Sequence, residues 1–303
     1  MIDLRRLHVL RAVDHYGSVT AAAHALHFTP SAASQQIRQL GRELGVTLLE
    51  PAGRKVRLTP SALSLLAHAD AIHERWEQAE IELHSEWQEA AGLLRLSAFP
   101  TALSSLLAPA CARLRERHPR LQVRLREDPV HETFNLLFEG VVELGVVEMT
   151  PDNPTLGDPR FDQRPLLDDP FDLVVRADHA VAGRDRIDLI ELADEDWIVP
   201  PEVVPCRAQT LAACTAAGFT PTIAHEAVEW FATGALVANG LGVALVPRMV
   251  HIPPHLPVVR VPCAGNPSRK LLTATRRGAR GHPGVAAAVE MLEELAPTAV
   301  AEP

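Results

Sequence analysis

Residues 18–44 read SVTAAAHALHFTPSAASQQIRQLGREL, and this stretch decides the fold of the N-terminal part of the chain. It predicts two helices with a short turn between them. The first is rich in alanine and follows Ser18, a typical N-cap residue. The second begins after Thr29-Pro30, because threonine caps a helix and proline suits its first position. Gly45 ends it, so the stretch predicts a helix-turn-helix unit.

The second helix of this unit has two different faces. Its buried face is predicted at Ala33, Ile37, Leu40 and Leu44. Its outward face carries Ser31, Ser34, Gln35 and Arg38. These side chains donate and accept hydrogen bonds of the kind made to base edges and phosphates, so we predict that they contact DNA. The alternative is that they are ordinary solvated positions on a surface helix.

The rest of the first 59 residues supports this prediction. A helix with Leu4, Leu7, Leu10 and Val13 at helical spacing precedes the unit, and Gly17 ends it. After Gly45, two short strands are predicted around the basic tip PAGRK, residues 51–55. We expect Arg54 and Lys55 in this tip to contact phosphates, because a flexible tip follows the DNA backbone.

The charge of the chain is unevenly distributed. The formal net charge is −9, which by itself argues against a nucleic-acid partner. Residues 1–62, however, hold eight Arg or Lys and only four Asp or Glu, whereas residues 63–91 hold one Arg and seven acidic residues. A small basic segment on an acidic chain indicates that this segment meets a polyanion.

The N-terminal pattern resembles that of the LysR-type transcriptional regulators. The match runs in register through Ser18, Ala22, Ala23, Leu26, Ser34, Gln36, Ile37, Leu40, Leu44, Gly45, Leu48, Leu58 and Thr59. The chain departs from the family pattern at Gly41, where Glu is usual, and at Leu49, Pro51 and Ala62. The resemblance implies a winged helix-turn-helix DNA-binding domain over residues 1–59, in a regulator that acts by binding and is not an enzyme.

Residues 60–91 are predicted to form one long helix. Apolar residues recur at steps of three and four, a coiled-coil pattern that needs a partner helix. We predict a dimer interface at Leu65, Ile72, Trp76 and Leu83. In the resembling family this helix pairs two subunits, which implies a homodimer. A homotetramer and contact with RNA polymerase are further expectations.

Strands and helices alternate from residue 92 onward, which is typical of an α/β domain. The expected fold class is therefore α + α/β: a winged helix-turn-helix, a long linker helix and an effector domain. The resemblance implies two subdomains of periplasmic-binding-protein shape, subdomain I at about 92–165 plus 267–303 and subdomain II at about 166–266. The segment Gly-Leu-Gly-Val-Ala-Leu-Val-Pro, residues 240–247, fits this part of the family.

Candidate effector-binding residues follow the predicted strands, where small ligands of α/β domains usually bind. They are Ser97, Phe99, Pro100, Thr101, Glu148, Pro200, Trp230 and Phe231. Thr101 is equally well explained as a helix cap, and the two aromatic residues as packing residues. Ser97 and Thr101 at a helix N-terminus favour a small organic acid, whereas Glu148 indicates a cationic or neutral effector.

The sequence lacks the motifs of several other classes of protein. No metal, nucleotide or hydrolase motif is present, so no cofactor is expected. Cys206 and Cys214 lie near the place where a peroxide-sensing branch of the family has two cysteines, and the alternative is two small buried residues. No run of apolar residues predicts a membrane span, so we expect a cytoplasmic protein. A solute-binding or transport protein is the alternative function, and an enzyme comes third.

Overall fold

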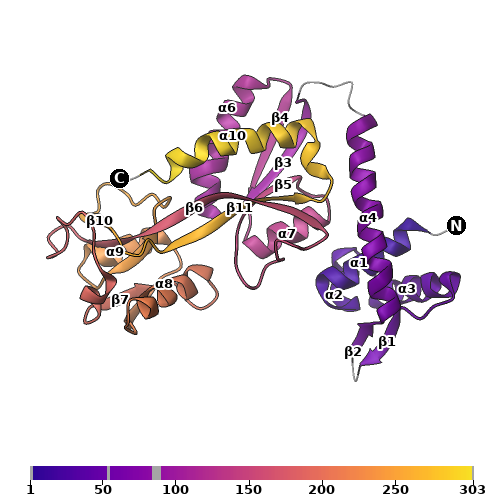
Figure 1. The fold of residues 1–303 in the computed structure, drawn as a ribbon, viewed down its shortest axis with the longest axis horizontal. Helices are drawn as coiled ribbons and strands as arrows, with labels where there is room; N and C mark the ends of the chain where they lie inside the picture. Colours follow the sequence, from indigo (N-terminus) through magenta and orange to yellow (C-terminus); the bar gives the residue numbers. More distant parts are fainter. Residues whose placement is uncertain (1–2, 53–54, 84–89, 302–303) are drawn as a thin grey trace. The chain divides into compact units, whose positions relative to one another are not determined.

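The computed structural model describes residues 3–52, 55–83 and 90–301. The chain divides into two compact units. The first comprises residues 1–86 and 277–279, and the second comprises residues 87–276 and 280–303. The ribbon in Figure 1 shows the helices of the first unit and the mixed sheet of the second. No helix in the described part of the chain is both long enough and apolar enough to cross a membrane.

Capping residues determine where the three N-terminal helices begin and end. These helices are α1 (Leu4–Tyr16), α2 (Val19–Ala25) and α3 (Pro30–Leu44). The predicted caps are confirmed: the side chain of Ser18 accepts a hydrogen bond from the N–H of Ala21, and that of Thr29 from Ala32. Gly17 and Gly45 both adopt the left-handed conformation that ends a helix, with φ of 70° and 69°. Ala33, Ile37 and Leu40 are fully buried, as their spacing predicts.

A hairpin and a long helix complete the first unit. Strands β1 (Leu49–Ala52) and β2 (Lys55–Leu58) pair antiparallel, so the predicted wing is confirmed. Helix α4 runs from Pro60 to Leu83. Part of the predicted extension to residue 91, at residues 84–89, lies outside the described residues. Ala90 and Ala91 are not helical, so the prediction that the helix extends to residue 91 is wrong at its C-terminal end. The coiled-coil repeat of apolar residues also loses its register near this end.

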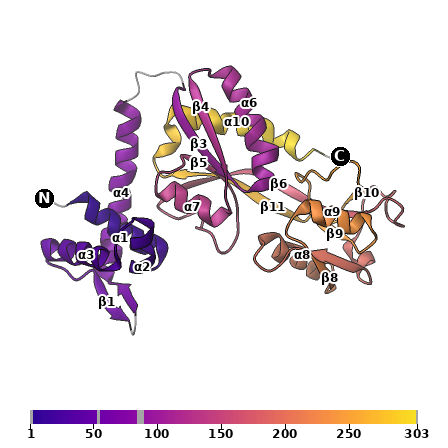
Figure 2. The ribbon, with the colours of Figure 1, turned by 180° about the vertical axis from the view of Figure 1, so that it is seen from behind.

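The second unit is built on a seven-stranded mixed sheet with the order β10-β6-β11-β5-β3-β4, and β9 also pairs with β6. Its strands are β3 (Gly92–Ala98), β4 (Leu121–Glu127), β5 (Leu144–Glu148), β6 (Phe161–Arg176), β9 (Ala244–Pro247), β10 (Val258–Pro262) and β11 (Ser268–Arg276). The two long strands β6 and β11 pair with each other and extend through both halves of this unit, as the ribbon shows (Figures 1 and 2). A separate pair, β7 (Asp196–Val199) and β8 (Thr222–Glu226), is parallel.

Three hydrophobic clusters lie along this sheet, one in the first half and two in the second. In the first half, α6 (Ala108–Arg117) and α10 (Pro283–Ala299) pack against each other, while α7 (Val130–Phe138) packs on β5 and β11 (Figure 2). In the second half, Trp197, Leu173 and Leu245 centre a core that includes α8 (Pro205–Ala216). Helix α9 (Trp230–Ala238) packs on β6 and β9. Separate cores in two halves that share long strands form the expected two-subdomain architecture.

The structure corrects some predicted elements of this unit. The helix that follows β3, expected from the alternation of strands and helices, begins at Pro100 and is not regular: it contains a π-helical segment, Leu103–Leu107, between α5 (Pro100–Ala102) and α6. Pro109 follows directly, and a proline cannot donate the next helical hydrogen bond, which explains the wider turn. Strand β6 is long, from Phe161 to Arg176, and the residues of β8 and β10 lack a clear alternation of apolar and polar side chains, so the sequence pattern does not delimit these strands.

Candidate DNA-contact surface and effector cleft

The predicted DNA-contact residues lie on one side of α3. Ser31, Gln35 and Arg38 are exposed, and Ser34 is half-buried. The hydroxyl of Ser31 lies 3.0 Å from that of the capping residue Thr29. Within the described residues, Gln35 and Arg38 form no side-chain hydrogen bond or ion pair. This face therefore presents an unpaired amide and an unpaired guanidinium to a partner.

The wing is described only in part. Arg54 lies outside the described residues, and so does the side chain of Lys55, so the predicted phosphate contacts there stay predictions. Arg57 on β2 forms an ion pair with Glu50 across the hairpin, at 2.6 Å between Nε and Oε1. That pair reduces the positive charge that the wing offers to DNA.

The predicted dimer residues form an apolar stripe on α4. Ile72, Trp76 and Leu83 are large apolar side chains with exposed fractions of 46%, 57% and 76%, whereas Leu65 is half-buried. The indole N–H of Trp76 donates to Glu80 on the same helix. Exposed apolar residues at coiled-coil spacing are typical of a helix that packs against a second one.

Ser97, at the end of β3, is fully buried and already hydrogen-bonded. Its hydroxyl donates to Asp128 (2.9 Å) and lies 2.9 Å from the hydroxyl of Thr133. Asp128 also accepts two hydrogen bonds from Arg126. Burial opposes ionisation of Asp128, but the hydrogen bonds from Arg126 and Ser97 outweigh it and lower its pKa. The Ser97 hydroxyl is thus committed to a carboxylate.

The neighbouring predicted residues are Phe99, Pro100 and Thr101. Phe99 occupies the N-cap position of α5 without a side-chain cap, and Thr101 lies inside that helix. The alternative of Thr101 as a helix cap is therefore wrong. Phe99 and Thr101 are both buried, so neither presents an open surface to an effector.

Glu148, at the end of β5, belongs to a buried charged cluster that joins the two halves of the second unit. Its carboxylate accepts a hydrogen bond from Gln209 of α8 (2.5 Å) and lies 3.7 Å from Nη1 of Arg269 on β11. Arg269 is held more closely by Asp169 of β6, with Nε and Nη2 at 2.9 and 2.8 Å from Oδ2. Its guanidinium also lies over the ring of Phe99, at 5.1 Å.

The balance of charge in this cluster is uneven. Two buried carboxylates, Glu148 and Asp169, share the single guanidinium of Arg269. Burial raises the pKa of both carboxyls, and the charge of Arg269 only partly offsets it. A neutral amide, that of Gln209, supplies the other contact to Glu148. The cluster therefore has spare capacity for a hydrogen-bond donor or a cation.

Sequence reasoning missed Asp169, Gln209 and Arg269. A usable signal was present for Arg269: it stands two residues before Leu271, and alternate residues of a strand share a face, so it would lie on the buried side. Nothing in the sequence pairs it with Asp169, 100 residues earlier.

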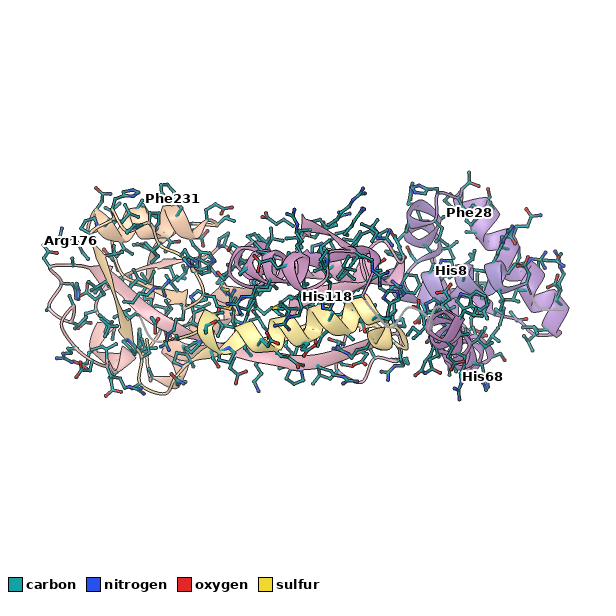
Figure 3. The ribbon with its side chains drawn as sticks, turned by 90° about the horizontal axis from the view of Figure 1, so that it is seen from above. His8, Phe28, His68, His118, Arg176 and Phe231 are labelled. Atoms are coloured by element: carbon teal, nitrogen blue, oxygen red, sulfur yellow. The ribbon has the colours of Figure 1, made fainter. Side chains whose placement is uncertain are left out.

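The candidates from the second half of the unit lie in different environments. Pro200 is buried, and its carbonyl accepts a hydrogen bond from Arg207. Trp230 is half-buried and packs against both cores of this half, which agrees with the packing alternative. Phe231, labelled on α9 in Figure 3, is 59% exposed. The structure thus brings Glu148 and Phe99 together around Arg269, but does not gather all eight predicted residues into one cavity.

A cavity of about 530 Å³ lies beside α8. Gln209 is among its lining residues, and none of the eight predicted effector residues lines it. Among the described residues no cluster of three metal-ligating side chains is present. The thiols of Cys206 and Cys214 are both buried and free, and Sγ of Cys206 lies 3.8 Å from Nη1 of Arg269.

Comparison with known proteins gives a family match for the N-terminal region and another for the C-terminal region. A model of the bacterial regulatory helix-turn-helix of the lysR family matches residues 4–63, and a model of the LysR substrate binding domain matches residues 87–297. The hydrogen peroxide-inducible genes activator of Pectobacterium carotovorum is 27% identical over 82% of this chain and 80% of its own. The transcriptional dual regulator GltC of Bacillus subtilis is 29% identical over 82% and 81%. The fold matches that of a Corynebacterium glutamicum OxyR mutant, with a TM-score of 0.63, 22% identity and coverage of 99% and 94%.

Proposed function

The chain belongs to the LysR family of bacterial transcriptional regulators, and on this premise we propose which of its residues read DNA and which sense an effector. It is a DNA-binding transcription regulator with an effector-binding domain, and it is not an enzyme. The observation that carries the proposal is the outward face of α3. The side chains of Gln35 and Arg38 on this face have no partner within the described residues, while Ala33, Ile37 and Leu40 on the opposite face are fully buried. Because its partner is chromosomal DNA, we place its action in the cytoplasm.

We assign base contacts to Gln35 and Arg38 and a supporting role to Ser31 and Ser34. The amide of glutamine suits adenine and the guanidinium of arginine suits guanine in the major groove. The apolar stripe of α4 supports a homodimer, which would present two α3 helices to half-sites about 34 Å apart. Association into a homotetramer and contact with RNA polymerase are further parts of the proposal, and they rest on the family resemblance.

The test is a titration of Gln35→Ala and Arg38→Ala against a duplex selected from a random library by the wild-type protein. Each substitution should weaken specific binding by about 1–3 kcal/mol, because each removes a base contact. Binding to an unrelated duplex should change much less for Gln35→Ala, which removes no charge. Arg5→Ala, an exposed arginine on α1, is the control. Equal affinities of wild type and both variants for the selected duplex would refute this assignment.

We propose that the effector is recognised where the two halves of the second unit meet, at Glu148 and Arg269. The charge balance favours a neutral or cationic effector over the organic acid that the N-terminus of α5 suggested. Asp169 already accepts a hydrogen bond from Nε of Arg269, and Asp128 accepts one from Ser97, so a buried carboxylate already faces each of these groups. An effector that donates a hydrogen bond could replace the amide of Gln209 at Glu148, and so change the contact between the two halves.

Control by peroxide is not part of this proposal, although one of the relatives is named for it. A sensing cysteine needs a thiolate, and burial raises the pKa of Cys206 to about 12 and that of Cys214 to about 11. The positive charge of Arg269 is balanced by Glu148 and Asp169, so it does not activate Cys206.

A further inference from the structure

A second surface of the DNA-binding unit is organised around Arg42. A groove of about 500 Å³ lies between the C-terminal half of α3 and the start of β1, and we name it the α3–β1 groove. It is lined by Ile37, Arg38, Gly41, Arg42, Gly45, Val46, Thr47, Leu48 and Leu49. Among the described residues that line it, two are arginines and none is acidic. A groove with this lining suits an anion.

Gly41 is required for the shape of the groove. A Cβ atom at this position would meet the carbonyl oxygen of Val46 at 2.6 Å, which is too close for any side chain. The absence of a side chain at Gly41 lets the turn after α3 approach the helix. It also means that no carboxylate can occupy this position between the two arginines.

The guanidinium of Arg42 is held in place without being neutralised. Its Nη2 donates to the amide oxygen of Gln39 (2.5 Å), and Nε2 of Gln39 donates to Glu43 (2.9 Å). Arg6 of α1 donates a further hydrogen bond to Glu43. The negative charge of Glu43 is therefore compensated by Arg6, while Arg42 contacts a neutral amide and, within the described part of the chain, no carboxylate. A fixed cation without a carboxylate partner is prepared to bind an anion.

Two of the last four carbonyls of α3 are paired with N–H groups of the turn that follows, which reduces the partial negative charge at this end of the helix. Helix C-termini carry partial negative charge on their free carbonyls. In this helix the N–H of Val46 donates to the carbonyl of Gly41 (2.9 Å), and the N–H of Gly45 donates to that of Arg42 (3.3 Å). Both carbonyls are thus covered by the turn. The hydroxyl of Thr47, exposed on the same turn, forms no hydrogen bond within the described residues.

We propose that the α3–β1 groove binds a phosphate of the DNA backbone, with Arg42 and Thr47 as contact residues beside Arg38. The inference rests on the proposed DNA-reading role of α3 and extends it. Residues 31, 35, 38 and 42 recur at steps of four and three, so Arg42 continues the DNA-contact face by one turn. The groove would hold the backbone that borders the major groove read by Gln35 and Arg38.

The test is Arg42→Ala, measured by fluorescence anisotropy on the selected duplex and on an unrelated duplex between 0.1 and 0.3 M salt. Loss of one phosphate contact lowers the slope of log affinity against log salt by about 0.9. If the variant and the wild type bind equally at 1 M salt, the affinity of the variant should be about eightfold lower at 0.1 M salt and about threefold lower at 0.3 M. The loss should be equal on both duplexes, since a phosphate carries no sequence information.

Arg75→Ala is the matched control. Arg75 is an exposed helical arginine that is likewise held by a glutamine amide three residues away, Gln78 (3.0 Å), but it lies on α4 outside the groove. It should leave the salt slope unchanged. Gln39→Ala keeps the charge of Arg42 but removes its support, so affinity should fall by less and the slope should persist. Thermal midpoints confirm that each variant is folded.

The possible outcomes separate the two proposals. An unaltered slope for Arg42→Ala, with Gln35→Ala still defective, would overturn the groove assignment and leave the reading face intact. A wild-type protein that selects no duplex would refute the DNA-reading assignment itself. Calorimetry with inorganic phosphate tests whether the groove instead binds a free anion. Phosphate binding that depends on Arg42, together with an unchanged affinity of Arg42→Ala for DNA, would show such a site and would also overturn the proposal.

Discussion

Cys206 offers a quantitative test of how the buried cluster controls chemistry. Burial raises its pKa to about 12, from an ordinary value of 9.0. At pH 7 this leaves about a thousandfold less thiolate than in an ordinary cysteine. A more basic thiolate is intrinsically more reactive, by about twentyfold for this difference in pKa. Disulfide exchange at Cys206 should therefore be about fiftyfold slower than for a free cysteine, before its poor accessibility is counted.

The assay is reaction of the native protein with 5,5′-dithiobis(2-nitrobenzoate) at pH 7, followed site by site by mass spectrometry. The same reaction in denaturant provides the control, because all four cysteines are then accessible. Cys214, with a pKa raised to about 11, should also react slowly. Peroxide should not join Cys206 and Cys214: eight residues of helix separate them by about 12 Å, beyond the reach of a disulfide while α8 is intact.

Two results would refute this reasoning. One is exchange at Cys206 in the native protein at the rate of a free cysteine or faster, which would mean that Arg269 acts on the thiol despite its two carboxylates. The other is a Cys206–Cys214 disulfide formed by peroxide while the helical circular dichroism is retained. Either result would make Cys206 and Cys214 candidates for redox sensing again.

Two further predictions concern the dimer and the effector. Ile72→Glu places a charge in the apolar stripe of α4 and should dissociate the dimer in sedimentation, whereas Ala67→Glu, exposed on another face, should not; an unchanged mass for Ile72→Glu would exclude this stripe as the interface. Glu148→Gln keeps the size of the side chain but removes its charge. Primary amines should raise the thermal midpoint of the wild-type protein more than carboxylates of the same carbon skeleton, and the variant should lose this preference; stabilisation by carboxylates alone would contradict the proposed effector class.

The DNA-binding part could be predicted from the sequence because its determinants are local. Ser18 and Thr29 cap helices that begin at the next residue, and Gly45 ends the helix that immediately precedes it. The buried face of α3 follows from spacing within a single helix. Each of these signals acts over a few residues, so a pattern read along the chain contains it.

The effector region could be predicted only in part because its determinants are distant in sequence. Glu148 was identified from its place at the end of a strand, but its environment is set by Gln209 and Arg269, which come 61 and 121 residues later. Ser97 was expected to offer a free hydroxyl, yet Asp128 on the segment after β4 takes it. Strand spacing predicts that these chain segments meet at one edge of a sheet, but it does not predict which side chains satisfy one another.

The pairing of arginines explains how a chain with a net charge of −9 binds DNA at one surface. In the second unit, arginines such as Arg126, Arg248 and Arg269 form ion pairs with carboxylates, which removes their attraction for a polyanion. On α3, Arg38 has no partner within the described residues and Arg42 contacts only a neutral amide. Attraction to a phosphate decays over about 10 Å at 0.1 M salt, so these unpaired local charges, and not the charge of the whole chain, decide where DNA binds. A substitution that adds a carboxylate beside Arg42 should thus weaken binding without touching a base contact.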